Sequence, residues 1–290
     1  MTISKFVTLS NGVKMPIFGL GTWQASKELV YVSVKTAINN GYRLIDTAAA
    51  YFNEEAIGEA LAETFKEGKL KREDIFITTK CPPPFLHPDK QEEAINASLS
   101  KLKLDYVDLY LAHMPCAYDG ELKPEKILHD CKPEDIWKGL EKLYDKKLTR
   151  SIGISNFKIE QIHRVAKIAK VPIHNHQVEL HLRSSWPAGP APLENHIVQH
   201  LAKKYSKSPA QILLRHLIQK GIAVIPKSTN EKRIFENFQI FDFELDSNEM
   251  KNLYNIAQQP RLFWQDFLIG HPEDPYKEER EKQPQSKHNV

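Results

Sequence analysis

The stretch from Arg43 to Thr79 contains the pattern that decides the fold. It begins with the short run Arg43-Leu44-Ile45-Asp46-Thr47, continues with apolar residues at helical spacing over residues 56–65, and ends with Ile75-Phe76-Ile77-Thr78-Thr79. A buried strand, a helix and a second buried strand, in this order, are typical of the unit from which parallel sheets are built. The stretch therefore predicts an α/β protein with a parallel sheet.

The same alternation continues through most of the 290 residues. Strands are predicted at Ile17–Leu20, Arg43–Thr47, Ile75–Thr79, Val107–Ala112, Ser151–Ser155, His176–Leu180 and Ala223–Pro226. Helices are predicted at Glu28–Ile38, Ala56–Phe65, Gln91–Leu102, Pro133–Tyr144 and Glu160–Ile168. Repeated units without a glycine-rich dinucleotide fingerprint favour a closed parallel (β/α)8 TIM-type barrel over an open sheet.

Both ends of the chain depart from this alternation. Phe6–Leu9 and Val13–Met15 predict an N-terminal β-hairpin, because Asn-Gly between them favours the positive φ of a type I′ turn. Residues from His271 onward are rich in Glu, Lys, Pro and Gln. We therefore expect one barrel domain over residues 1–270 and a mobile charged tail over residues 271–290.

The alternation is interrupted between Leu180 and Ala223. A proline-rich loop at Ser184–Pro192 comes first, and two helices are predicted at Ile197–Tyr205 and Pro209–Gln219. The second helix has Ser208 as its expected N-cap. An eight-stranded barrel would need another strand in this region.

The composition argues against several classes of protein. Hydrophobic residues make up 41% of the chain, and the formal charge of +3 is spread without a dense basic block, so neither nucleic-acid nor membrane partners are expected. The three cysteines have no CxxC or CxxH spacing, so we expect no metal site and a reducing, cytosolic location. Nothing in the sequence predicts the oligomeric state.

Four polar residues follow successive predicted strands, where the active site of a parallel barrel assembles: Asp46, Tyr51, Lys80 and His113. Taken singly, the aspartate could be a helix cap, the tyrosine a packed aromatic and the lysine a surface charge. Together they could deliver a proton to a carbonyl oxygen, because a lysine ammonium lowers the pKa of a nearby phenol. None of them supplies a hydride, so the chemistry requires a cofactor.

Three motifs also resemble those of the aldo-keto reductase family. They are Gly41-Tyr42-Arg43-Leu44-Ile45-Asp46-Thr47-Ala48 with Tyr51-Phe52-Asn53-Glu54-Glu55-Ala56-Ile57-Gly58, then Ser151-Ile152-Gly153-Ile154-Ser155-Asn156-Phe157, and finally Ile225-Pro226-Lys227-Ser228 with Arg233. The resemblance implies NADPH-dependent reduction of a small carbonyl compound. It makes Tyr51 the proton donor, Lys80 the residue that lowers its pKa and His113 the residue that orients the substrate.

The resemblance also implies the residues that hold cofactor and substrate. Ser155, Asn156 and Gln177 would hold the nicotinamide carboxamide, and Trp23 would border the substrate. Lys227, Ser228 and Arg233 would bind the 2′-phosphate that distinguishes NADPH from NADH, although without the resemblance they would be taken for surface residues. The remaining expected cofactor contacts are Gly21, Thr22, Asp46, Glu236 and Asn237.

The resemblance fails after Leu182. Leu182-Arg183-Ser184-Ser185 runs directly into Trp186-Pro187, so the sixth helix and the seventh strand of the barrel are expected to be missing. That unit would carry the aromatic residue that stacks on the nicotinamide and the loop that contacts the pyrophosphate. The alternative hypothesis is therefore a catalytically impaired binding or structural protein derived from a reductase.

Overall fold

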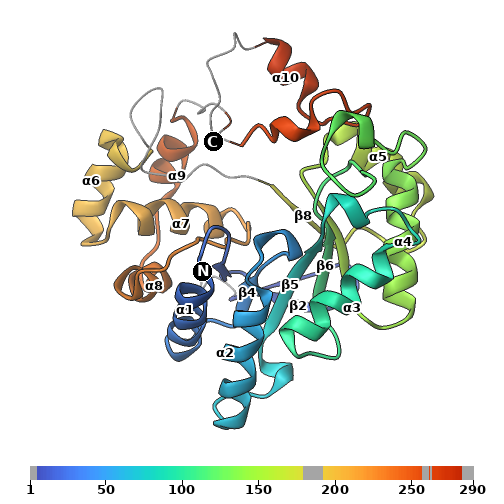
Figure 1. Ribbon diagram of the computed structural model, residues 1–290. Coiled ribbons are helices and arrows are strands. Elements are labelled where there is room, and N and C mark those ends of the chain that lie inside the picture. The colour runs from blue at the N-terminus through green and yellow to red at the C-terminus, as the bar shows by residue number, and fades with distance from the viewer. Residues whose placement is uncertain (1–4, 179–191, 257–260, 262, 283–290) are drawn as a thin grey trace.

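The computed structural model describes residues 5–178, 192–256, 261 and 263–282 (Figure 1). The chain begins with the predicted antiparallel hairpin, β1 (Phe6–Thr8) and β2 (Lys14–Pro16). The predicted type I′ turn is wrong, because Gly12 has a φ of +84° but Asn11 is not among the residues with positive φ. The Gly12 N–H donates to the Leu9 carbonyl at 2.8 Å, as expected when a left-handed glycine ends the turn of a longer hairpin loop.

Within residues 5–178, six parallel strands form one curled sheet in the order β3-β4-β5-β6-β7-β8. They are β3 (Leu20–Gly21), β4 (Leu44–Asp46), β5 (Phe76–Cys81), β6 (Leu109–Ala112), β7 (Ile152–Ser155) and β8 (Asn175–Gln177). On the other side of β3, parallel bridges join Phe18 to Val224 and Gly21 to Lys227. The segment 224–227 therefore takes the place of a further strand beside β3.

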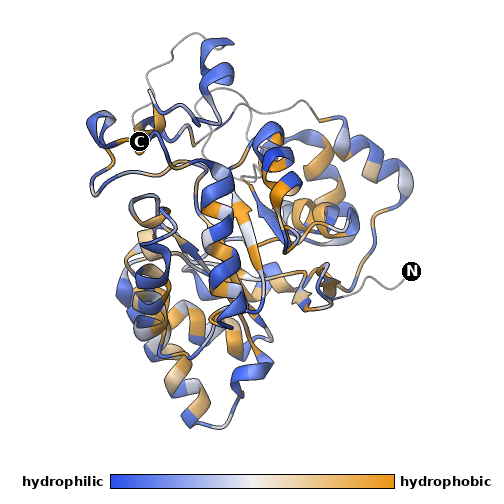
Figure 2. Cartoon of the chain, turned by 90° about the vertical axis from the view of Figure 1, so that its right-hand side faces the viewer, coloured by the Kyte–Doolittle hydropathy of each residue, from blue (hydrophilic) through white to orange (hydrophobic). Residues whose placement is uncertain are grey.

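Five helices follow the strands in turn and cover the outer face of the sheet (Figure 1). They are α1 (Lys27–Asn39), α2 (Glu54–Lys66), α3 (Gln91–Leu102), α4 (Pro133–Asp145) and α5 (Ile159–Ile168). Their apolar sides face the sheet and their polar sides face outward (Figure 2). In α4, for example, Ile136, Leu140 and Leu143 are buried at the spacing of one helix face. The five predicted helices are confirmed within two residues at each end.

Two helices follow β8 before Val224 among the described residues, as predicted. The described residues between β8 and Val224 contain η5 (Pro192–Glu194), α6 (His196–Tyr205) and α7 (Pro209–Gln219), but no strand. Ser208 caps α7 as predicted, since its side chain accepts from the Gln211 N–H at 3.3 Å. The last two residues predicted for the sixth strand, 179 and 180, and most of the proline-rich loop lie outside the described residues. The described residues thus form a TIM-type barrel in which the helix and the strand expected after β8 do not occur among the described elements.

Alternation along the strands separates two layers of the core. Leu44, Phe76 and Leu109 point to the inner face, where Leu9 and Met15 of the hairpin pack against them. Their neighbours along the strands pack under the outer helices: Ile45, Ile77 and Tyr110. Residues two apart on a strand share a face, so polar residues two or four positions further along continue the inner face toward the C-terminal ends of the strands.

Two helices follow the segment 224–227, namely α8 (Glu231–Phe238) and α9 (Ser247–Tyr254). The chain then returns to the barrel through η6 (Asp266–Leu268) and α10 (Lys277–Lys282). His271, Asp274 and Tyr276 are buried, and the Glu273 carboxylate contacts the Arg164 guanidinium at 2.9 Å. The structure thus differs from the predicted mobile tail as far as Lys282. These few buried residues and the ion pair hold the segment on the barrel although the residues around them are polar. Residues 283–290 lie outside the described residues.

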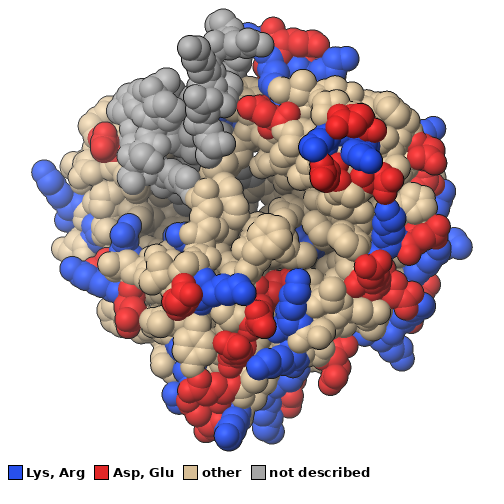
Figure 3. All heavy atoms as spheres, viewed as in Figure 1, with Lys and Arg blue, Asp and Glu red and all other residues tan. Residues whose placement is uncertain are grey.

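The outer surface shows charges of both signs, mixed with one another over the helices, and a largely uncharged centre on the face seen in Figure 3. Many of the charges are paired, as in the Lys35–Glu67 contact of 2.7 Å between α1 and the end of α2. None of the helices in the described part of the chain is long and apolar enough to cross a membrane.

Gly58 lies at a close contact of α2 with the C-terminal end of α3. A Cβ atom at this position would lie 2.2 Å from the Lys101 carbonyl oxygen, which is backbone and cannot turn aside. We expect Gly58→Ala to lower the free energy of unfolding by about 2 kcal/mol through overpacking, although alanine normally stabilises a helix relative to glycine. Urea denaturation measures this, with the exposed neighbour Glu59→Ala as control. Equal stability of Gly58→Ala and wild type would show that the helices separate without cost.

Candidate active site

The structure brings all four predicted catalytic side chains together at the C-terminal ends of the strands. Asp46 lies two residues after the inward-facing Leu44, and Lys80 lies four residues after Phe76, so both point into the barrel. His113 directly follows β6. Tyr51 comes from η1 (Ala49–Tyr51), a single turn that is separated from β4 by two residues. Short connections after neighbouring strands thus gather the four groups.

Lys80 is the centre of this cluster. Its Nζ lies 2.7 Å from Asp46 Oδ1, 2.8 Å from the Thr47 carbonyl oxygen and 3.4 Å from Tyr51 Oη. Lys80 is 1% exposed and Asp46 is 4% exposed, so water does not screen the pair. Burial lowers the pKa of Lys80, but the attraction of Asp46 outweighs it and raises that pKa above its ordinary value. An ammonium therefore stands beside the phenol at neutral pH.

The phenol of Tyr51 is protonated in this environment. Burial raises its pKa, and the charge of Lys80 opposes this without reversing it. Lys80 thus lowers this pKa, as expected, but the desolvation of the phenolate is larger, so the net shift is upward. A protonated phenol whose phenolate has a cation 3.4 Å away can act as an acid.

His113 faces the same space as Tyr51, and the two rings lie 5.7 Å apart, edge to face. Burial and the charge of Lys80 lower the pKa of His113 to about 3, so its imidazole is neutral at neutral pH. A neutral imidazole has one donor and one acceptor nitrogen. His113 Nδ1 is buried and finds no hydrogen-bond partner among the described residues. His113 therefore supplies a hydrogen bond and no charge.

A second group of polar residues lies at the ends of β7 and β8. Gln177 Nε2 donates to Asp46 Oδ2 at 3.2 Å, while Gln177 Oε1 is buried without a partner among the described residues. Asn156 has a φ of +64°, and its Nδ2 donates to the His113 carbonyl oxygen and to Ser155 Oγ, both at 3.1 Å. The amide and hydroxyl groups of Ser155, Asn156 and Gln177 are thus joined to the catalytic cluster.

The residues expected to bind the 2′-phosphate lie between the bridge of Lys227 to Gly21 and the first turn of α8. Lys227 and Arg233 are exposed, and Ser228 is 9% exposed. Asn230 caps the helix, since its side chain accepts from the Arg233 N–H at 2.9 Å. Two cations near a helix N-terminus suit an anion. Glu236 and Asn237 follow on the same helix.

The expected contacts at the end of β3 lie next to the catalytic cluster. Thr22 is buried and its Oγ1 donates to the Asp46 carbonyl oxygen at 2.9 Å. A Cβ at Gly21 would lie 2.6 Å from the Ile225 carbonyl oxygen, so only glycine allows this approach of the two strands. Trp23 is partly exposed and its ring packs edge to face against Phe263 at 4.7 Å. One aromatic wall beside the site thus comes from the C-terminal region.

One contact of the site was missed from the sequence. Tyr276 Oη donates to Asn156 Oδ1 at 3.0 Å. Tyr276 stands among Glu, Lys and Pro residues, which predicted a mobile tail and gave no signal of burial.

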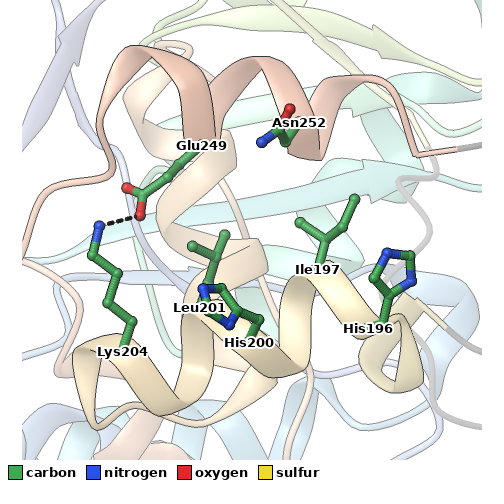
Figure 4. A pocket seen from close by; sticks show the side chains of 7 residues that line it. All are labelled: His196, Ile197, His200, Leu201, Lys204, Glu249 and Asn252. Atoms are coloured by element: carbon green, nitrogen blue, oxygen red, sulfur yellow. Dashed lines mark hydrogen bonds and ion pairs between the residues drawn. The ribbon is translucent and has the colours of Figure 1, made fainter.

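Two surface hollows are lined by residues outside this cluster. One, of about 280 Å³, lies between α6 and α9 and is closed at one end by the Lys204–Glu249 ion pair (Figure 4). The other, of about 410 Å³, is lined by hairpin residues and by the N-terminal ends of β5 and β6. None of the expected catalytic or cofactor residues lines either hollow. Among the described residues, no three His, Cys, Asp or Glu side chains group as a metal site.

Comparisons of the sequence and of the fold with known proteins agree with each other. The model of the Aldo/keto reductase family matches residues 17–187 and 192–258. Aldo-keto reductase family 1 member A1 of Sus scrofa is 41% identical over 88% of this chain and 90% of its own length. The solved aldose reductase of Schistosoma japonicum superposes with a TM-score of 0.87 at 38% identity, over 95% of this chain and 100% of that one.

The same comparisons support a missing unit. Aldo-keto reductase family 1 member C15 of Rattus norvegicus is 37% identical over 320 aligned positions, covering 95% of this chain and 98% of the relative. The alignment is longer than the 290 residues of the chain, so the relative contains positions that have no counterpart here. The chain belongs to the aldo-keto reductase family.

Proposed function

We propose that the chain reduces aldehydes or ketones to alcohols with NADPH as the hydride source and Tyr51 as the proton donor. The observation that carries the proposal is the contact of Lys80 Nζ with both Asp46 and Tyr51 at the end of the inner face. Membership of the aldo-keto reductase family supports carbonyl reduction in general. The proposed substrate is a small carbonyl compound, and the proposed location is the cytosol.

The four side chains have distinct roles in this proposal. A carbonyl oxygen placed between Tyr51 Oη and His113 accepts a hydrogen bond from each, which favours negative charge on that oxygen. Tyr51 then transfers its proton, and the ammonium of Lys80 stabilises the phenolate that remains. Asp46 keeps Lys80 charged and in place. NADPH, when bound, supplies the hydride.

The residues present fit a nicotinamide cofactor. Gln177 Oε1 is a buried acceptor without a partner among the described residues, as an amide N–H₂ group requires. Ser155 Oγ accepts from Asn156, which leaves its own hydrogen for an amide oxygen. Lys227, Ser228 and Arg233 would hold the 2′-phosphate. Loss of the ring-stacking residue, which the family resemblance implies, would lower the affinity by roughly 0.5–1.5 kcal/mol for one aromatic pair.

Cofactor choice tests the proposal directly. We expect fluorescence titration of the purified chain to show saturable NADPH binding, NADH to bind more weakly, and a broad aldehyde to be reduced at the expense of NADPH. Arg233→Gln should weaken NADPH binding about 10-fold, because a charge-assisted hydrogen bond is lost, and should leave NADH binding unchanged. Lys142→Gln, at an exposed position of α4 outside all the expected site residues, is the control.

The alternative of a non-catalytic descendant makes the opposite prediction. A folded chain that neither binds NADPH nor reduces any aldehyde would establish that alternative. Binding without preference between NADPH and NADH would instead refute only the role of Lys227, Ser228 and Arg233.

A further inference from the structure

The side-chain amide of Asn156 is held from three directions. Its Nδ2 donates to the His113 carbonyl oxygen and to Ser155 Oγ, and its Oδ1 accepts from Tyr276 Oη at 3.0 Å. The first two partners belong to the barrel, whereas Tyr276 lies 120 residues further along the chain, just before α10. The orientation of Asn156 thus depends on the C-terminal segment.

Tyr276 is itself firmly placed. It is 5% exposed, and its backbone N–H donates to Asp274 Oδ1 at 2.9 Å. The guanidinium of Arg261 lies 4.1 Å from the centre of its ring, and Arg280, whose Nη1 donates to the Trp264 carbonyl oxygen, lies 5.9 Å from it. A tyrosine fixed in this way presents its hydroxyl at one defined point.

The amide needs this third partner because the other two fix only its nitrogen. Asn156 Nδ2 has two hydrogens and both are engaged, so a flipped amide would turn Oδ1 toward the His113 carbonyl oxygen. Without Tyr276 Oη, Asn156 Oδ1 would lose the hydrogen-bond donor that fixes its direction. The second lone pair of Asn156 Oδ1 can accept a hydrogen bond from a carboxamide. Asn156 also holds Ser155 Oγ, so a tilt of the amide would move two of the three proposed cofactor contacts.

We infer that Tyr276 is a positioning residue for the nicotinamide carboxamide, acting through Asn156, and that the C-terminal segment is therefore part of the cofactor site. This inference rests on the proposed function, because it assigns Asn156 to the cofactor. It adds a residue to the site that lies outside the three family motifs in the sequence.

Tyr276→Phe tests the inference, since it removes one oxygen atom and keeps the packed ring. We expect the dissociation constant and the KM of NADPH to rise about 3- to 10-fold, in line with the loss of one hydrogen bond, and kcat to change little. The hydrogen bonds of Asn156 hold the cofactor equally before and after hydride transfer. Their weakening should therefore change cofactor binding and leave the rate of hydride transfer nearly unchanged.

Tyr118→Phe is the matched control. Tyr118 is also buried, and its hydroxyl donates to the Phe267 carbonyl oxygen at 2.7 Å, so it anchors the same C-terminal region without touching Asn156. We expect a similar loss of thermal stability and unchanged NADPH affinity. If both variants weaken NADPH binding equally, general docking of the segment is responsible and the inference is wrong.

Two further outcomes separate this inference from the proposed function. If wild type binds NADPH and Tyr276→Phe binds it equally well, the positioning role is refuted while the proposed function stands. If wild type binds no NADPH, the proposed function fails and the inference fails with it.

Discussion

Tyr51→Phe should reduce kcat for carbonyl reduction by at least about 100-fold, because a positioned general acid contributes about 10²- to 10⁴-fold to such a rate. The substitution removes the hydroxyl that lies 3.4 Å from Lys80 Nζ and leaves the ring that packs against His113. NADPH binding should be unchanged, because the hydroxyl is not assigned to the cofactor. Stopped-flow turnover and fluorescence titration of the same preparation measure the two quantities.

Tyr205→Phe provides the control for this experiment. Its hydroxyl donates to Glu249 Oε2 at 2.6 Å between α6 and α9, far from the strand ends that carry the site. We expect full turnover from this variant. If Tyr51→Phe turns over near the wild-type rate, another residue donates the proton. If Tyr51→Phe loses NADPH binding, the hydroxyl of Tyr51 has a structural role.

The sequence predicted the parts of the fold that depend on local pattern. Strands and helices in a repeated βα unit have distinct periods, and the capping residue Ser208 lies where a serine before a proline predicts it. The hairpin was predicted, but its turn type was not, because Asn-Gly favours several turns and the actual loop length decides among them. The missing helix and strand expected from the family motifs on either side of residues 182–186 stay a prediction, because residues 179–191 lie outside the described residues.

Contacts between distant segments could not be predicted in the same way. The charged composition after His271 hides the anchors of that segment, which become visible only where Glu273 meets Arg164 and Tyr276 meets Asn156. The pKa of Tyr51 is a second example. The sequence places a lysine near it, but the size of the opposing effect depends on how deeply the fold buries the phenol.

Lys80→Met should destabilise the fold and abolish turnover together. The substitution leaves Asp46 Oδ1 and the Thr47 carbonyl oxygen buried without the donor that now lies 2.7–2.8 Å away. Removing one partner of a buried ion pair costs about 3–5 kcal/mol, because the remaining charge stays desolvated. We expect a fall of that size in the free energy of unfolding from urea denaturation. Loss of the ammonium also raises the pKa of Tyr51 further, so carbonyl reduction stops.

The double variant Asp46→Asn with Lys80→Met separates these two effects. Neutralising both partners removes the desolvated charge, so most of the lost stability should return, while turnover should not, because the phenolate of Tyr51 still lacks its cation. A double variant as unstable as Lys80→Met would show that packing, and not the unpaired charge, causes the loss. A stable double variant that still reduces aldehydes would remove Lys80 from the mechanism. A double variant that is stable but inactive is the result expected when the ion pair of Asp46 and Lys80 serves catalysis.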